Sequence, residues 1–411
     1  MKPWRLLKCT AHWVPPLTKP DYDMVVVGGG INGAGAAQAA AAAGHKVLLL
    51  EKTALAAGTS SKSSKLVHGG LRYLESYEFG LVHESLRERA LLLKNAPELV
   101  QWQTFVVPLY RHTRRSPMLL RTGLSLYWLL SGMKAEARFE AIPRAQWGEL
   151  NGLQTDELRG VFRYRDARTD DAALTRAVMQ SAASLGGELQ CPAEFVGADL
   201  QPDGCTIVYR VAGEQRSVTA RTLINAAGPW VNEVAKRVQP ELSRVQVELV
   251  QGTHIEVPGD MTGDFYYLES PRDGRAVFVM PRAGRLIVGT TETRYRDVPD
   301  KVHPLRGEES YLLSVLQHYF PAYREVQRNE LLASWAGLRV LPSSGGHAFH
   351  RSRETILHVD RQTRPRMLSI YGGKLTTYRA TAEKVVQRLS ESLPARAPVA
   401  DTRTLTLTPA E

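Results

Sequence analysis

A glycine-rich turn between two short apolar segments constrains the fold of this chain more than any other feature of its sequence. Residues 24–27 (MVVV) run directly into residues 28–35 (GGGINGAG), which open an alanine-rich stretch that ends at Gly44. Residues 46–50 form a second apolar segment, and Glu51 follows it. Strand, glycine turn, helix, strand and acid in this order make up the βαβ unit that binds dinucleotides.

The three fingerprint glycines have separate physical roles in such a unit. Gly28 allows the tight turn, Gly30 lets the backbone approach a pyrophosphate, and Gly33 lets the helix pack closely on the strand. The helix N-terminus then presents free N–H groups and its positive dipole end to the anion. Glu51 can accept hydrogen bonds from the adenosine ribose, and its charge would repel a 2′-phosphate, which argues against NADP.

Two later segments favour FAD over NAD as the dinucleotide. Residues 221–230 (RTLINAAGPW) form an apolar strand that ends in Ala-Ala-Gly, and such a strand returns to the cofactor in flavoproteins of this type. Residues 59–73 (TSSKSSKLVHGGLRY) are dense in hydroxyls and glycines, which suit a phosphate and a flavin edge as hydrogen-bonding partners. The chain therefore leaves the first βαβ unit and returns to it much later, which predicts a discontinuous FAD-binding domain.

Segments along most of the chain resemble one protein family. They read, in order, GGGINGAG, TSSKSSKLVHGGLRYLESYEFGLVHESLRER, NAAGPWVN, QGTHIEVP, VFVMPRAGRLIVGTTE, SWAGLRVLP and YGGKLTTYR. They resemble the FAD-dependent glycerol-3-phosphate dehydrogenases of the D-amino-acid-oxidase-like flavoprotein superfamily. That family usually continues into a C-terminal helical domain, which we expect this chain to lack. Residues 343–353 (SSGGHAFHRSR) also differ from an Asp-rich stretch expected there.

The resemblance implies oxidation of sn-glycerol 3-phosphate to dihydroxyacetone phosphate, with hydride transfer to flavin N5 and electrons passed to a quinone or another acceptor. A phosphate-bearing substrate needs several cations, preferably arginines with a bidentate fork. The resemblance assigns catalytic roles to His254, Arg339 and Lys374, with His254 as the acceptor of the hydroxyl proton. The residues that it implies for substrate binding are Arg72, Tyr73, Arg339 and Arg353.

The same resemblance implies a large set of FAD contacts and no metal site. The expected cofactor-binding residues are Gly28, Gly30, Gly33, Glu51, Thr59, Ser60, Ser61, Ser64, Lys65, His68, Gly228, Gly337, Gly373, Lys374, Leu375 and Thr376.

The expected fold class is α/β with an α+β substrate part: a Rossmann-like FAD-binding domain, discontinuous in sequence, and a substrate domain with an antiparallel sheet. Helices are expected at residues 75–96, 166–185 and 376–389. Strands at residues 245–257, 276–280 and 285–290 follow one another without interleaved helices, which favours the antiparallel sheet. The expected boundaries are residues 1–20 for a disordered leader, 21–105, 160–235 and 331–395 for the FAD-binding domain, 106–159 and 236–330 for the substrate domain, and 396–411 for a tail.

Charge and hydropathy bear on the partners. Lys and Arg number 52 against 42 Asp and Glu, a formal net charge of +10 that is consistent with an anionic partner. No recognisable RNA-binding module is present, so no nucleic-acid partner is expected. No apolar run reaches the length of a membrane span, and three separated cysteines fit a reducing compartment. We expect a cytoplasmic location, with peripheral contact to the inner face of the cytoplasmic membrane left open.

Residues 118–133 are the segment that could make peripheral contact with a membrane, because they are apolar and aromatic and follow Arg111, Arg114 and Arg115. This segment could lie on anionic lipid, or it could be a helix packed on the sheet of its own domain, which we favour.

Three other functions compete with the leading one. An oxidase or dehydrogenase of a 2-hydroxy acid or an amino acid could use the same fold, but a carboxylate needs about one arginine rather than a cluster. A non-catalytic or tRNA-associated flavoprotein would exploit the positive charge. A member of the family that has lost its activity is disfavoured by the intact SSKLVHGGLRY and GGKLTTYR segments.

Overall fold

The glycine-rich turn lies at the carboxyl end of β1 (Tyr22–Val27), inside the first of two sheets in the computed structural model. The model describes residues 19–343 and 355–410. β1 pairs in parallel with β2 (Val47–Leu50) on one side and with β10 (Glu214–Asn225) on the other. All of β2 and nearly all of β1 are buried, as expected for parallel strands covered on both faces.

The rest of this first sheet extends from β10 and β2. β10 pairs in parallel with β19, which the chain reaches only near its end, and antiparallel with β9. The sheet that carries the glycine turn is therefore assembled from segments far apart in the sequence, as expected for the domain that the turn begins. The remaining strands are β7 (Glu188–Gln190), β8 (Glu194–Gln201), β9 (Gly204–Val211), β11 (Val238–Gln239), β18 (Ile356–Val359) and β19 (Met367–Tyr371).

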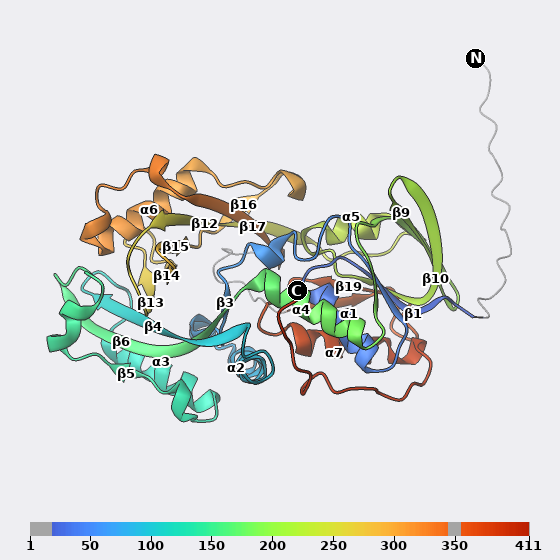
Figure 1. Cartoon of the computed structure of the whole chain (residues 1–411), viewed down its shortest axis with the longest axis horizontal. Coiled ribbons are helices and arrows are strands. Elements are labelled where there is room, and N and C mark those ends of the chain that lie inside the picture. The colour runs from blue at the N-terminus through green and yellow to red at the C-terminus, as the bar shows by residue number, and fades with distance from the viewer. Residues whose placement is uncertain (1–18, 344–354, 411) are drawn as a thin grey trace, which may run out of the picture.

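Alternate residues of β1 enter two different cores. Met24 and Val26 pack toward α1 (Ile31–Ala42), α4 (Asp171–Ser184) and α7 (Tyr378–Leu389), which lie together in Figure 1. Val25 and Val27 pack on the other side, against residues of β8, β9 and the short helix α5 (Val231–Lys236). The period of two along the strand thus builds both layers from one segment.

The second sheet is mainly antiparallel and lies beside the first (Figure 1). Its longest pairings join β4 to β6 and β12 to β17. One face packs on α6 (Arg306–Tyr319), and the other packs on residues of α2 (Phe79–Asn95) and α3 (Pro117–Leu130). Its strands are β3 (Leu66–Val67), β4 (Val100–Tyr110), β5 (Glu140–Ala141), β6 (Leu158–Thr169), β12 (Val247–Pro258), β13 (Phe265–Glu269), β14 (Ala276–Arg282), β15 (Arg285–Gly289), β16 (Thr293–Tyr295) and β17 (Ala333–Pro342).

This architecture confirms the expected fold class, and it differs from the expected boundaries in a few places. The helix expected from residue 166 begins at Asp171, because residues 158–169 are a strand and the Asp170 side chain caps the helix by accepting from the Ala173 N–H. The helix expected from residue 75 begins at Phe79, after a 3₁₀ turn. The closing helix begins at Tyr378.

Strand pairing also assigns several segments differently from the expected domain boundaries. β6 and β17 pair within the second sheet, whereas their sequences were grouped with the FAD-binding domain. Both are long strands whose partners are distant in sequence, so local pattern could not place them. The expected tail packs back on the body: the Val399 N–H donates to the Ala42 carbonyl, and Leu407 is buried. The leader falls almost entirely on residues outside the described ranges.

Helix α3 covers most of residues 118–133, for which two interpretations were left open. Leu120, Leu124 and Tyr127 are buried against the second sheet, so the helix packs on its own domain. Met118 and Leu119 at its start are exposed, at 80% and 57%. Among the described residues, no helix is long and apolar enough to cross a membrane.

Candidate active site

A cavity of about 950 Å³ is lined by residues from both sheets. Pockets that hold cofactors and small ligands commonly have volumes of roughly 300–1,000 Å³. The segments that line it are far apart in the sequence, from the β1–α1 turn to the loop after β19. The expected cofactor-binding residues that line it are Gly28, Gly30, Glu51, Thr59, Ser60, Ser64, His68, Gly228, Gly337, Gly373, Lys374, Leu375 and Thr376.

The glycine turn at one end of the cavity is built for close backbone approach. Gly28 has a φ of +111°, and a Cβ on Gly33 would lie 1.8 Å from the Gly28 carbonyl oxygen. Both glycines are therefore required by the packing of α1 on the turn. A Cβ on Gly30 would meet the Ser60 Oγ at 3.2 Å and no other described atom within 4 Å, so this position faces the cavity. The residues present thus fit a pyrophosphate at the N-terminus of α1.

Glu51 is held at the end of β2 by three hydrogen bonds. Its Oε2 accepts from the Gly29 N–H at 2.7 Å, and its Oε1 accepts from the Thr53 N–H at 2.8 Å and the Thr53 hydroxyl at 3.0 Å. A carboxylate has about four acceptor positions, so capacity remains for ribose hydroxyls on the cavity side. This geometry fits the role that the sequence suggested for the acid.

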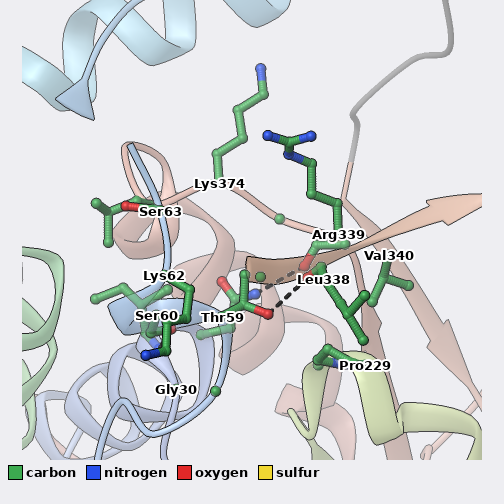
Figure 2. A pocket seen from close by; sticks show the side chains of 18 of the residues that line it. Gly30, Thr59, Ser60, Lys62, Ser63, Pro229, Leu338, Arg339, Val340 and Lys374 are labelled. Carbon is green, nitrogen blue, oxygen red and sulfur yellow. Dashed lines mark hydrogen bonds between the residues drawn. The ribbon is translucent and has the colours of Figure 1, made fainter. Parts of the chain in front are cut away.

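The hydroxyl-rich segment divides into residues that face the cavity and residues that support the loop. The Thr59 hydroxyl donates to the Leu338 carbonyl at 2.8 Å, which joins this loop to β17 (Figure 2). Lys65 instead forms an ion pair with the buried Asp171 at 2.6 Å. Gly33, Ser61 and Lys65 are not among the described residues that line the cavity, and Arg353 lies outside the described residues.

The loop after β19 is fastened to both neighbouring segments. The Asn32 side-chain amide donates to the Gly372 carbonyl at 3.0 Å, and the Thr376 hydroxyl accepts from the His68 N–H at 3.1 Å. Gly373 has a φ of +106°, and a Cβ there would lie 2.6 Å from the Asn32 side chain. This explains why a glycine precedes Lys374.

Cationic side chains gather at the other end of the cavity. Arg339 on β17 donates to the Thr291 carbonyl and the Thr290 hydroxyl, both at 3.2 Å. The Lys374 ammonium lies 3.9 Å from the ring centre of Tyr73, and the Arg72 guanidinium lies 6.0 Å from the same ring. In Figure 2 the side chains of Arg339 and Lys374 extend in the same direction, away from Gly30.

His254 on β12 is buried beside these cations. Its Nε2 lies 2.9 Å from the Ser64 Oγ, and its ring stacks on Trp335 with a centroid distance of 5.3 Å. Burial, with the nearby charges of Arg339 and Lys65, lowers the pKa of His254 to about 3. The imidazole is therefore neutral at neutral pH, and so low a pKa makes it a weak proton acceptor while the site is empty. An anion bound at Arg339 would offset the positive charges that help to lower this pKa.

Sequence reasoning missed several residues of this end. Glu292 and Arg275 line the cavity, with a Glu292 carboxylate oxygen 3.6 Å from the Arg339 guanidinium. Glu292 belongs to the GTTE segment quoted above. The signal that could have identified it was an acidic residue shortly after the expected strand at residues 285–290. Trp335, in SWAGLRVLP, was available only as an aromatic on the strand that carries Arg339.

Comparison with known proteins identifies the class of this fold and site. The family model described as FAD dependent oxidoreductase (DAO) matches residues 23–379, and the chain belongs to this family. It is an FAD-dependent oxidoreductase, and the glycine cradle and the Glu51 carboxylate described above are suited to that cofactor.

The curated relatives of the chain include dehydrogenases that are named for phosphorylated substrates. The chain is 38% identical to D-erythritol 1-phosphate dehydrogenase of Brucella abortus, over 90% of this chain and 74% of that protein. It is also 38% identical to glycerol-3-phosphate dehydrogenase of Pseudomonas tolaasii, over 92% of this chain and 72% of that protein. It is 33% identical to the aerobic glycerol-3-phosphate dehydrogenase of Staphylococcus aureus, over 93% of this chain and 69% of that protein.

Solved structures agree with this assignment. Glycerol-3-phosphate dehydrogenase from Bacillus halodurans, complexed with FAD, matches with a TM-score of 0.73 and 26% identity, over 94% of this chain and 67% of that chain. L-α-glycerophosphate oxidase from Mycoplasma pneumoniae, with FAD bound, matches with a TM-score of 0.74 over 95% and 99% of the chains. At 18% identity the second likeness shows the fold alone.

The substitution Gly30→Val tests the cofactor cradle. We expect the variant to fold but to purify without flavin, because the new side chain would occupy the space through which the backbone approaches a pyrophosphate. Visible flavin absorbance per protein, with circular dichroism as the check on folding, gives the answer. Gly148→Val is the control, since a Cβ there meets no described atom within 4 Å. A full flavin spectrum in Gly30→Val would contradict the cradle.

The pH dependence of stability tests the environment of His254. An unfolded histidine takes up a proton near pH 6.5, whereas the folded pKa is about 3. Protons therefore favour the unfolded state as the pH falls below 6.5, and stability is lost in that window. The free energy of unfolding of the wild type relative to His254→Gln should fall by about 2 kcal/mol between pH 7 and pH 5. Urea unfolding at both pH values measures it, and an unchanged difference would show that the imidazole titrates normally.

Proposed function

We propose that the protein oxidises sn-glycerol 3-phosphate to dihydroxyacetone phosphate, passing a hydride to flavin N5. The observation that supports this most is the gathering of Arg339, Lys374 and Arg72 around one end of the cavity, next to a neutral buried histidine. Several cations at one point suit a dianionic phosphate better than a single carboxylate. Relatives named as glycerol-3-phosphate dehydrogenases, at 33% and 38% identity, support the same substrate.

The side chains divide the chemical work in this proposal. FAD, when bound, supplies the hydride acceptor. Arg339 and Arg72 hold the substrate phosphate, assisted by the Tyr73 hydroxyl, and so orient the carbon that carries the reacting hydrogen. His254 accepts the proton from the substrate hydroxyl as the carbon–hydrogen bond breaks. Lys374 supplies positive charge beside the reacting centre, where it anchors the substrate and stabilises developing negative charge.

A longer sugar-alcohol phosphate is the second candidate substrate. The 38% identity to a D-erythritol 1-phosphate dehydrogenase favours it, because that substrate presents the same phosphate and secondary alcohol on a longer chain. Glu292 and Arg275 in the cavity wall could hydrogen-bond extra hydroxyls. The third candidate, a 2-hydroxy or amino acid, has no use for the additional cations.

Anaerobic mixing of the yellow holoenzyme with each candidate substrate is the experiment that tests the proposal. We expect glycerol 3-phosphate to bleach the flavin rapidly. Arg339→Ala and Lys374→Ala should keep FAD but lose roughly 100-fold or more in kcat/KM, since truncating one partner of a buried charge contact costs about 3 kcal/mol. Arg285→Ala and Lys384→Ala, which remove surface ion pairs, serve as matched controls.

Two results would overturn the substrate assignment. Flavin that stays oxidised with glycerol 3-phosphate, but is reduced by erythritol 1-phosphate or by a hydroxy or amino acid, would transfer the assignment to that compound. Kinetics near the wild type in Arg339→Ala would reject the phosphate site even if glycerol 3-phosphate is the substrate.

We further propose that a quinone accepts the electrons and that helix α3 lies on the membrane surface that holds it. Met118 and Leu119 expose apolar surface beside the exposed Arg121, a combination suited to an anionic interface. Arg115 does not add to this charge, because it is paired with Glu75 and Glu269. Contact of this kind needs no spanning helix.

Vesicle binding tests the membrane proposal. The wild type should co-sediment with phosphatidylglycerol vesicles, and Met118→Gln/Leu119→Gln should bind more weakly by roughly 100-fold or more, because each of the two buried apolar side chains contributes about 1.5–3 kcal/mol. Val399→Gln, at an exposed apolar residue elsewhere on the surface, is the control. Equal binding of the double variant and the control would rule out α3 as the contact.

A further inference from the structure

A buried hydrogen-bond network lies beneath the segment that carries His68, Arg72 and Tyr73. The Tyr127 hydroxyl on α3 donates to the Asp166 carboxylate, at 2.8 Å from Oδ2, and accepts from the Gly69 N–H at 2.7 Å. Arg89 on α2 forms an ion pair with the same carboxylate. The three elements that supply this network, α2, α3 and β6, lie side by side in Figure 1.

The network is buried, and the Tyr127 hydroxyl and both Asp166 carboxylate oxygens have hydrogen-bond partners. Tyr127, Asp166 and Arg89 are 2%, 1% and 2% exposed. Arg89 compensates the charge of Asp166 through Oδ1, and the Tyr127 hydroxyl donates to Oδ2. Burial and the Asp166 charge raise the pKa of Tyr127, which keeps the phenol protonated and able to donate. The hydroxyl is thus free to serve Gly69 as an acceptor.

Gly69 packs directly against this hydroxyl, and no side chain would fit at its position. A Cβ at this position would lie 2.5 Å from the Tyr127 hydroxyl oxygen and 2.5 Å from the Leu86 Cδ2. Gly70 follows with a φ of +80°, and the chain then turns Arg72 and Tyr73 into the cavity. Without the phenol, the Gly69 N–H would retain a contact to Asp166 Oδ1 at 3.3 Å. The Tyr127 hydroxyl is the nearer of the two acceptors of the Gly69 N–H, and it therefore helps to set where the backbone enters the substrate end of the site.

We propose that Tyr127 is a positioning residue, whose hydroxyl fixes the Gly69 backbone and thereby the placement of Arg72 and Tyr73. Tyr127 itself is not among the described residues that line the cavity, so it acts through the loop. The consequence for catalysis rests on the proposed function, in which Arg72 and Tyr73 hold the substrate phosphate. Loss of the hydrogen bond lets this loop drift, and small misplacements of binding groups weaken substrate orientation strongly.

The experiment compares Tyr127→Phe with the wild type as holoenzymes. Phenylalanine keeps the ring and removes the hydroxyl. We expect hydrogen–deuterium exchange to quicken in the peptide covering residues 66–74, with FAD content unchanged. We expect the KM for glycerol 3-phosphate to rise about tenfold, as for the loss of one well-formed hydrogen bond, with a smaller change in kcat. Tyr110→Phe is the matched control, a buried tyrosine whose hydroxyl donates to the Gln154 carbonyl.

Each outcome decides the proposal. Faster exchange confined to residues 66–74, together with the rise in KM, supports it. Exchange and kinetics equal to those of Tyr110→Phe overturn it, as does faster exchange spread evenly over the whole chain, which would mean a structural role alone. Rapid exchange of the Gly69 amide in the wild type also overturns it, without any variant. If glycerol 3-phosphate does not reduce the wild-type flavin, the proposed function fails, and the exchange data still decide the role of Tyr127.

Discussion

The close approach of helix α1 to the β1 turn is the constraint on which the rest of the structure depends. No side chain fits between Gly33 and the Gly28 carbonyl, and a Cβ on Gly35 would lie 2.7 Å from the Tyr378 ring. Because glycine and alanine have little or no side chain, β1 and α7 can both pack closely against the backbone of α1. The loop after β19, which precedes α7, is thereby brought to Asn32 at the start of α1. For this reason the glycine turn and the loop that carries Lys374 are held at fixed positions relative to one another.

Two buried ion pairs connect these packed elements to the second sheet. Arg379 on α7 forms a two-pronged pair with Glu88 on α2, at 2.6 and 2.7 Å, and the next residue of α2, Arg89, pairs with Asp166 on β6. Helix α2 thus connects the cofactor side to the substrate side through charged groups that tolerate little displacement, because a buried charge without its partner is costly.

The sequence was sufficient for features whose signals are local. The βαβ unit, Glu51 and the strands at residues 276–280 and 285–290 could be predicted because turn chemistry and hydrophobic period act over a few residues. Arg339 and Lys374 were placed by resemblance to a family rather than by pattern. Tyr127 was missed because a tyrosine in an apolar helix is expected simply to pack in the core. Its role depends on Asp166 and Gly69, which the sequence separates from it by tens of residues. The sheet to which β6 and β17 belong was missed for the same reason.

The pairing of β10 with β19 has a consequence for the order in which the protein can become active. More than a hundred residues, including strands β12 to β17 of the second sheet, are synthesised between these two neighbouring strands. The cradle for the pyrophosphate is encoded at the start, but the residues that close the flavin site leave the ribosome near the end. The cavity is therefore complete only once the loop after β19 is available, and a chain cut before β19 would display the glycine turn without that part of the cavity wall.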